Sequence, residues 1–192
     1  MSDHFVLVDE SNVEVGTEEK MMAHVVPRLH RAFSIFVCNQ RGQLLMQLRA
    51  DGKYHSGGLW SNACCGHPRS GEDICVAAHR RLREEMGFDC ELFGAGTLIY
   101  RLDVGSAMSE HELNHVFIGM FEGDPSPDPV EVSEWRWFSR DDVLSGPLKL
   151  TAWFSPVLTH LANAPIVRAP DSSTSKGLSV ALQSWNQWSD RR

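Results

Sequence analysis

The sequence predicts one domain of the α/β (α+β) class, in which short strands and a few helices share a single core. Its 192 residues, 42% of them hydrophobic, are enough to bury such a core. Short apolar or alternating runs bounded by turn residues recur along the chain, a pattern typical of strands. Residues 73–86 instead repeat their apolar side chains at helical spacing. We expect residues 1–165 to form this domain and residues 166–192 to form a C-terminal tail.

The predicted strands, in chain order, are residues 5–8, 33–38, 44–48, 92–102, 113–121 and 134–138. A turn at residues 39–42 joins the second and third of these into a hairpin. Two glycines, Gly94 and Gly96, predict a β-bulge inside the fourth. Short helices are predicted at 141–144, where Ser139 and Asp142 form an N-cap signal, from Ser155-Pro156 to about 162, and at 178–188.

The stretch 64–88 concentrates groups that can carry chemistry, and it joins a predicted loop to the predicted helix. The loop holds the thiol of Cys65 and the imidazole of His67, two residues apart. On the helix, Arg81 and Glu85 are four residues apart and therefore share a face. Gly87 stands where a helix commonly ends. A thiol, an imidazole, a guanidinium and carboxylates brought together in this way predict a metal and phosphate site.

This stretch resembles the Nudix box. The matching residues are Gly66, Glu72, Arg80, Leu82, Glu84, Glu85, Gly87 and Phe88. One position departs, because Arg81 stands where Nudix hydrolases carry a glutamate of their magnesium cluster. The resemblance implies the Nudix fold, a mixed β-sheet sandwiched between helices. The cation at position 81 argues against pyrophosphate hydrolysis and favours an enzyme that keeps the diphosphate intact.

Composition excludes several classes of partner and location. A net charge of −7 argues against a nucleic-acid surface. The chain has no apolar run of membrane-spanning length, which is about 18 residues, and its first residues lack the layout of a signal peptide. Its five cysteines are odd in number and show no paired framework. We therefore expect reduced thiols, a cytoplasmic location, and no membrane partner.

Residues 111–115, His-Glu-Leu-Asn-His, match the zinc-protease pattern, but that motif binds metal only on a helix. The residues that follow, 116–121, favour a strand. On a strand the side chains alternate, so Glu110 and Glu112 would share one face as a carboxylate pair. We therefore reject the protease interpretation.

Beyond the Nudix box, the chain resembles the type 1 isopentenyl diphosphate isomerases. The match runs from about residue 20 to residue 156. It is most specific at residues 28–30 (Arg-Leu-His), 60–62 (Trp-Ser-Asn), 65–68 (Cys-Gly-His-Pro), 110–112 (Glu-His-Glu) and 154–156 (Phe-Ser-Pro).

That resemblance implies a function and a set of site residues. Cys65 and Glu112 would be the catalytic acid/base pair for the 1,3-allylic rearrangement of isopentenyl diphosphate to dimethylallyl diphosphate. A site for Mn²⁺, or for Zn²⁺ or Mg²⁺, would be formed by His24, His30, His67, Glu110 and Glu112. Glu85 would serve a Mg²⁺ that also touches the substrate diphosphate. The substrate-binding residues would be Lys20, Arg49, Lys53, Arg81 and Tyr100.

Such a reaction passes through a tertiary carbocation, so it requires a closed pocket with aromatic faces nearby. The candidate rings are Tyr100, Trp60 and Trp153, and each of them could instead serve core packing. We expect Cys64, the neighbour of the catalytic thiol, to be a packing residue.

The chain also departs from the isomerase pattern. Five residues separate His24 from His30, where the family usually has six. Residues 56–58, Ser-Gly-Gly, replace a Trp-Pro-Gly segment, which alters the loop that would close over the substrate. Ala63 replaces a serine, and Trp153 is one place away from the usual aromatic position. The alternatives are a Nudix pyrophosphohydrolase and an inactive Nudix module that binds a nucleotide or metabolite. The sequence says nothing about the oligomeric state.

Overall fold

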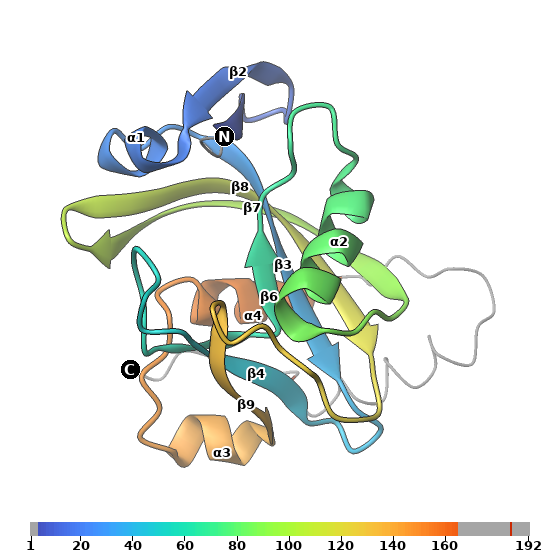
Figure 1. Cartoon of the computed structure of the whole chain (residues 1–192). Coiled ribbons are helices and arrows are strands. Elements are labelled where there is room, and N and C mark those ends of the chain that lie inside the picture. The colour runs from blue at the N-terminus through green and yellow to red at the C-terminus, as the bar shows by residue number, and fades with distance from the viewer. Residues whose placement is uncertain (1–3, 165–184, 186–192) are drawn as a thin grey trace.

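The computed structural model describes residues 4–164 and residue 185 (Figure 1). The strands are β1 (His4–Val8), β2 (Glu14–Glu19), β3 (His30–Cys38), β4 (Leu44–Arg49), β5 (Trp60–Asn62), β6 (Cys64–Gly66), β7 (Leu92–Gly105), β8 (Met108–Met120) and β9 (Val132–Phe138). The helices are α1 (Lys20–Val25), α2 (Ile74–Met86), α3 (Arg140–Ser145) and α4 (Phe154–Asn163). Among these helices, none has the length and apolar character needed to cross a membrane.

The strands form one mixed sheet around β3. Strand β3 pairs in parallel with β8 and antiparallel with β1, β4 and β6. The remaining pairs, β1 with β2, β7 with β8, and β4 with β5 and β9, are antiparallel. The long β7–β8 ribbon extends past the other strands, as Figure 1 shows. Every strand that carries a site residue is therefore within two strands of β3.

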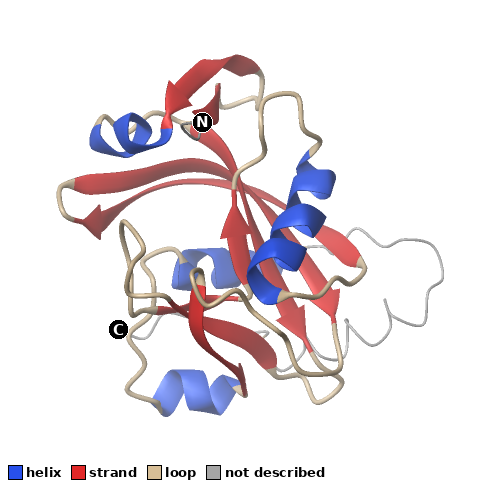
Figure 2. Ribbon diagram, in the orientation of Figure 1, coloured by secondary structure: helices blue, strands red, loops and turns tan. Residues whose placement is uncertain are grey.

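Helices cover both faces of this sheet (Figure 2). Because side chains alternate along a strand, β3 contributes to two separate cores. Phe33, Ile35 and Val37 pack with the buried residues of α2. Phe36 and Cys38 pack with the buried residues of α4. The predicted class, a mixed β-sheet sandwiched between helices, is confirmed.

Helix α2 has strong signals at both ends. The Asp73 side chain caps its start by accepting from the backbone N–H groups of Cys75 and Val76, at 2.9 and 3.2 Å. Gly87 ends it in the left-handed conformation, with φ of 73°. A Cβ atom at Gly87 would lie 2.1 Å from the Ser126 carbonyl oxygen, so the close approach of residue 126 also requires glycine.

Most predicted elements are present, several with longer ends. The bulge expected at Gly94 and Gly96 appears as a register shift between Gly94 and Thr97. Four elements were not predicted, namely β2, α1, β5 and β6. The expectation that Cys65 lies in a loop is wrong, because it lies on β6, which pairs with β3. A strand of three residues has too little local pattern to be recognised, since it is stabilised by its partner.

The predicted tail at 166–192 and the helix at 178–188 fall outside the described residues, apart from residue 185. Trp185 is fully buried in the core beside α4. Its indole N–H donates to the Gly42 carbonyl oxygen at 2.8 Å.

An ion pair fastens the loop before α2 to the helix itself. The Arg80 guanidinium donates to both oxygens of Glu72, at 2.7 and 2.8 Å. The hydrogen bonds from Arg80 hold the pKa of Glu72 below its usual value of 4.5. Glu72 also accepts from the backbone N–H of Arg69 at 2.8 Å. This pair therefore orders the turn between His67 and the helix.

We predict that Glu72→Gln lowers the free energy of unfolding by about 1 kcal/mol at pH 7. Because the pKa of Glu72 is lower in the folded state, its stabilisation is complete above pH 4.5 and is lost as the pH falls through the lowered pKa. Urea denaturation at several pH values measures the difference from the unmodified protein, which should shrink toward pH 3. Glu10→Gln, at an exposed position, is the control. A difference that stayed constant with pH would contradict this assignment.

Candidate active site

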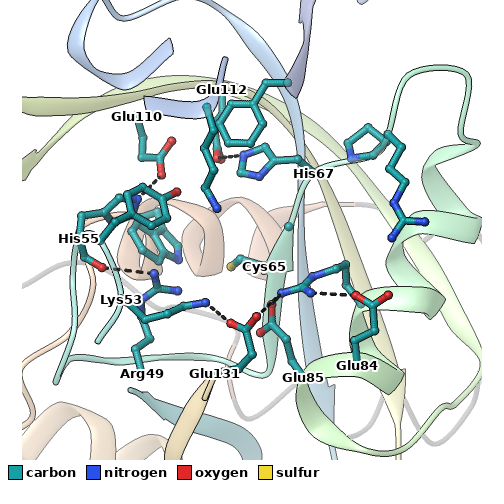
Figure 3. Close-up of a pocket in the computed structure, with 18 of the residues that line it drawn as sticks. Arg49, Lys53, His55, Cys65, His67, Glu84, Glu85, Glu110, Glu112 and Glu131 are labelled. Carbon is teal, nitrogen blue, oxygen red and sulfur yellow. Dashed lines mark hydrogen bonds and ion pairs between the residues drawn. The ribbon is translucent and has the colours of Figure 1, made fainter. Parts of the chain in front are cut away.

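The predicted site residues gather around one cavity of about 230 Å³ (Figure 3). Those that line it are Lys20, Arg49, Lys53, Cys65, His67, Arg81, Glu85, Tyr100, Glu110 and Glu112. His24 and His30 are fully buried and contact Glu110. In Figure 3, the labelled carboxylates Glu110 and Glu112 lie on one side, and a group of cations and acids lies on the other. Cys65 lies between these two groups.

Strand alternation decides which of the two adjacent cysteines faces the cavity. On β6, Cys64 is fully buried in the core beside α2. Cys65 faces the other way, toward the core beside α4, and lines the cavity. A shift of one residue in the pairing of β6 with β3 would exchange them. The observed register, Ser34 opposite Cys65, places the second cysteine in the cavity.

The Cys65 thiol is held by two polar side chains. Its S–H donates to the Asn62 carbonyl oxygen at 3.2 Å, and its sulfur lies 3.5 Å from the Ser34 hydroxyl. Burial raises the pKa of Cys65 to about 11. The group is therefore a protonated thiol near neutral pH.

The Glu112 carboxylate faces the cavity and contacts three polar side chains. Its Oε2 accepts from the Tyr100 hydroxyl and from the Asn114 amide, the latter at 2.9 Å. Its Oε1 lies 3.1 Å from His67 Nε2. Burial, followed by the charge of Glu112, raises the pKa of Tyr100 well above its usual value. Tyr100 is thus a neutral donor that keeps its proton beside Glu112.

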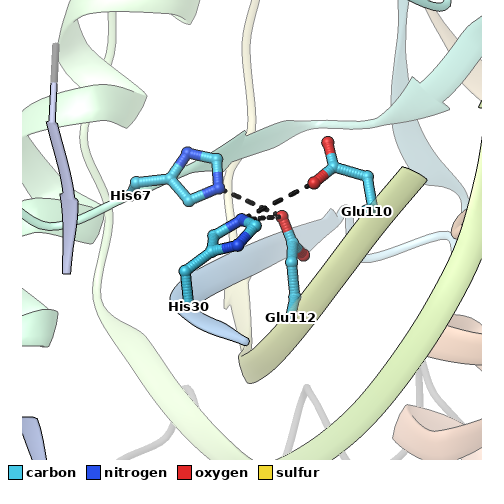
Figure 4. Close-up of side chains that lie close together, drawn as sticks. All are labelled: His30, His67, Glu110 and Glu112. Atoms are coloured by element: carbon cyan, nitrogen blue, oxygen red, sulfur yellow. Dashed lines mark hydrogen bonds and ion pairs between the residues drawn. The ribbon is translucent and has the colours of Figure 1, made fainter. Parts of the chain in front are cut away.

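Three imidazoles and two carboxylates converge above the thiol. His30, His67, Glu110 and Glu112 point toward one another in Figure 4, and their ligand atoms all lie within 4.8 Å. His24 Nε2 adds a contact of 3.0 Å to Glu110 Oε2, the oxygen that also lies 3.6 Å from His30 Nε2. His24 lies on helix α1 and His30 on β3, and with the shortened spacing between them both still reach Glu110.

This cluster fits a divalent metal ion. His30 Nε2 and Glu110 Oε2 are buried and lie near one another and near His24 Nε2, but neither atom has a well-aligned hydrogen bond of the kind that buried polar atoms normally make. Burial lowers the pKa of His67, which favours the neutral imidazole that a metal requires. Although burial alone would raise it, the three histidines around Glu110 hold its pKa well below the usual range. Imidazole nitrogens beside an ionised carboxylate are ligands suited to a transition metal.

The opposite side of the cavity is a network of cations and carboxylates. Arg81 pairs with Glu85, and it also lies 3.2 Å from Glu131. Lys53 pairs with the other oxygen of Glu131. Glu85 in addition accepts from the Gln47 amide at 3.1 Å. This network presents two cations to the cavity, with side chains held in place by carboxylates rather than free in solvent.

Several polar or aromatic residues of the site were not identified from the sequence. Tyr54, His55 and Glu131 line the cavity, and His55 Nε2 lies 2.9 Å from Glu110 Oε1. The sequence does place His55 two residues after Lys53, which was predicted to bind the substrate. This spacing could not be interpreted, because a loop has no regular alternation that tells which side chains share a face.

Of the two tryptophans considered, Trp153 lines the cavity, 5.2 Å from the Arg49 guanidinium. Trp60 does not line it and packs edge-on against Phe138.

Residues 111–115 are extended on β8, as predicted, and so cannot act as a helical zinc motif. Their histidines are also separate: His111 contacts the Pro27 carbonyl oxygen, and His115 contacts Asn12. The carboxylates at positions 110 and 112 instead share the cavity face.

Comparison with known proteins defines the class first. Residues 28–161 match the NUDIX domain model. Solved structures share the fold, among them the DR0079 protein of Deinococcus radiodurans, with a TM-score of 0.65 and 18% identity over 81% of this chain and 97% of that one. The MutT protein of Methanosarcina mazei gives a TM-score of 0.57 at 21% identity, over 67% of this chain and 89% of that one. At this identity, the likeness concerns the fold alone.

Sequence relatives define the family more narrowly. The isopentenyl-diphosphate Delta-isomerase 2 of Aromatoleum aromaticum is 43% identical over 95% of this chain and 99% of its own. The isopentenyl-diphosphate Delta-isomerases of Burkholderia multivorans and Pectobacterium atrosepticum are 48% and 49% identical, over 87% and 78% of this chain and 97% and 86% of their own. The chain therefore belongs to the isopentenyl-diphosphate Delta-isomerase family of Nudix-domain proteins.

We predict that Mn²⁺ stabilises the folded protein in the absence of substrate. Saturation at about 100 times the dissociation constant would raise the melting temperature by about 5–10 °C. Calorimetry with and without chelator measures the shift. Glu110→Gln should lose most of it, because the buried carboxylate shared by the histidines becomes neutral. Glu134→Gln, which removes a partly exposed carboxylate paired with Arg136, should keep it. Equal shifts in both variants would argue against this cluster as the metal site.

Proposed function

We propose that the protein isomerises isopentenyl diphosphate to dimethylallyl diphosphate, by moving one proton onto the alkene and removing another from it. The observation that carries this proposal is the shared cavity of Cys65 and Glu112, two proton-transfer groups on different strands. The family relationship supports the same reaction. The enzyme supplies positions for the proton transfers, while the diphosphate remains intact.

Cys65 and Glu112 are proposed as the acid/base pair. The bond from a protonating group to its hydrogen breaks as a new C–H bond forms at the terminal alkene carbon. The C–H bond at the carbon next to the diphosphate-bearing carbon breaks as the other group takes that proton, and the double bond moves. The neutral Cys65 thiol can give up a proton, and the Glu112 carboxyl group is the second proton-transfer group in the same cavity. Tyr100 and Asn114 orient Glu112.

The diphosphate would bind at the side of the cavity that carries the cations. Arg49, Lys53 and Arg81 line it there, and Lys20 lies nearby with its ammonium 4.4 Å from the Tyr54 ring centroid. Arg49 is 8% exposed, and its buried Nε makes no hydrogen bond. A guanidinium of this kind is preorganised for phosphate oxygens. Anchoring the charged end there directs the hydrocarbon end toward Cys65 and Glu112.

Two divalent ions are proposed. The nitrogen-rich cluster of His24, His30, His67, Glu110 and Glu112 would hold Mn²⁺, with Zn²⁺ or Mg²⁺ as alternatives. Glu85 would serve a Mg²⁺ whose other ligands are mostly diphosphate oxygens, since Mg²⁺ commonly uses few protein carboxylates. When bound, the first ion supplies positive charge beside Glu112 and holds its carboxylate in place.

The cavity walls suit a carbocation. Trp153 and Tyr100 present rings to the cavity, and a cation over such a face is stabilised by about 1–2 kcal/mol when water is excluded. The Trp153 indole N–H donates to the Ser61 hydroxyl at 3.2 Å, which fixes the ring. Phe5 stacks on the His67 ring, with the centroids 3.8 Å apart, and limits access of water from the metal side.

A Nudix pyrophosphohydrolase is less well supported. Arg81 stands at the position of a metal-binding glutamate in the Nudix box and forms an ion pair with Glu85. The helix therefore offers a cation where a hydrolase needs another carboxylate.

We further propose that residues 1–165 form one catalytic domain, and that the substrate is a small molecule rather than a nucleic acid or a membrane. All five cysteines are free, which supports a reducing, cytoplasmic location.

We predict that the purified protein converts isopentenyl diphosphate to dimethylallyl diphosphate when Mg²⁺ and Mn²⁺ are present, and that chelator abolishes this conversion. Product analysis by chromatography distinguishes the candidates. Released inorganic phosphate would instead indicate the hydrolase. Binding without any product would indicate an inactive Nudix module.

The two adjacent cysteines provide a matched pair of variants. Cys65→Ala should lower kcat by at least about 10²-fold, because it removes a proton-transfer group. Cys64→Ala should keep most of the activity, because Cys64 faces the core beside α2. Steady-state kinetics measures both, with circular dichroism to check folding. An equal loss from both substitutions would contradict the assignment.

A further inference from the structure

His55 is a buried histidine of the cavity that belongs to no motif identified in the sequence. It lies on the loop between β4 and β5, two residues after Lys53, and is 6% exposed. Its ring packs edge-on against Trp153 and against Tyr54, with the centroids 5.8 and 4.3 Å apart. Its Nε2 lies 2.9 Å from Glu110 Oε1, and the ligand atoms of His24, His55 and Glu110 all lie within 4.8 Å of one another. The ring is thus aimed at one carboxylate oxygen.

The two oxygens of Glu110 have different surroundings. Oε2 faces His24 and His30, at 3.0 and 3.6 Å, on the side where the five predicted ligands converge. Oε1 faces His55. A metal held by the convergent cluster would use Oε2, which leaves Oε1 in need of a hydrogen-bond donor in a buried place.

The other ring nitrogen of His55 contacts Ser56. The Ser56 hydroxyl lies 3.1 Å from His55 Nδ1. If the hydroxyl donates to Nδ1, the neutral ring carries its proton on Nε2, the nitrogen that faces Glu110. Ser56 holds this place with a positive φ of 53°, so the backbone of this loop has a defined shape. The Ser-Gly-Gly segment that departs from the family pattern therefore supplies a hydroxyl group that can act as this donor.

We propose that His55 is a positioning residue of the metal centre: its Nε2–H holds Glu110 through Oε1, so that Oε2 is presented to the ion. The chain of contacts runs from the Ser56 hydroxyl through the His55 ring and the Glu110 carboxylate to the ligand cluster. This inference rests on the metal centre of the proposed function and adds a residue to it.

The same residue connects the metal centre to the diphosphate side of the cavity. The His55 carbonyl oxygen accepts from the Arg49 guanidinium at 3.3 Å. Lys53 precedes it on the same loop and pairs with Glu131. Gly57 follows closely, where a Cβ atom would lie 2.8 Å from the Asp51 carbonyl oxygen, so this loop is closely packed. A change at His55 should therefore affect metal affinity first, and diphosphate binding through Arg49.

Mn²⁺ binding in the absence of substrate tests the proposal. Electron paramagnetic resonance titration of free Mn²⁺ gives the dissociation constant of the full-length protein and its variants. We expect His55→Ala to weaken binding by about 10- to 100-fold, as is usual for loss of a residue that orients a metal ligand. His55→Gln, whose amide can donate from a similar place, should recover most of the affinity. His79→Ala removes a half-exposed histidine paired with Asp89 on the surface and is the control.

Pulsed electron paramagnetic resonance of bound Mn²⁺ counts the imidazole nitrogens and separates positioning from ligation. The proposal requires the same three nitrogens in the unmodified protein and in His55→Ala. One nitrogen fewer in the variant would show that His55 is itself a ligand and would overturn the proposal, as would an unchanged dissociation constant. If the unmodified protein bound no Mn²⁺, the metal centre of the proposed function would be wrong as well, so the two failures are distinguishable.

Discussion

The register of strand β3 is the constraint on which the rest of the site depends. On one side it pairs in parallel with β8, with His30 opposite Glu112, and on the other it pairs with β6, with Ser34 opposite Cys65. The thiol and the carboxylate are therefore placed one strand to either side of β3, on the same face of the sheet. A slip of one residue in either pairing would turn one of them into the core beside α2. The hydrophobic cores on both faces, which bury Ile35 and Phe36 completely, oppose such a slip.

Burial of charge is the second feature that shapes this molecule. Glu110 is 4% exposed and is contacted by three imidazoles, an arrangement whose desolvation cost is large without compensation. A divalent ion bound at this cluster would reduce that cost by adding positive charge beside Glu110. The diphosphate side handles its charges differently, because Glu131 pairs with both Lys53 and Arg81 and keeps the cations ordered near solvent.

Helix α2, which carries most of the Nudix box, keeps the structural residues of that motif but differs from a Nudix hydrolase in its charged side chains. Glu72 and Arg80 act together as a structural ion pair that fastens the preceding loop to α2, and Gly87 ends the helix where residue 126 approaches. Arg81 pairs with Glu85 across one helical turn. The helix therefore carries an ion pair of one cation and one carboxylate, where a Nudix hydrolase would carry a cluster of carboxylates. The cluster of histidines and carboxylates lies instead on α1, β3, β8 and the segment after β6, while α2 packs mainly against the other face of the sheet.

The sequence by itself determined the fold class, the family and most of the elements, because helix caps, strand alternation and motif spacing are local signals. It also excluded a helical zinc motif at residues 111–115, since the residues that follow favour a strand, and it predicted that Glu110 and Glu112 share one face of that strand. Only the tertiary structure brought His55 to Glu110 and Trp153 to the cavity, and placed Cys65 on a strand rather than in a loop. These placements depend on contacts between residues far apart in the chain, or on loops without periodicity. The catalytic and ligand roles inferred from the family resemblance stay predictions.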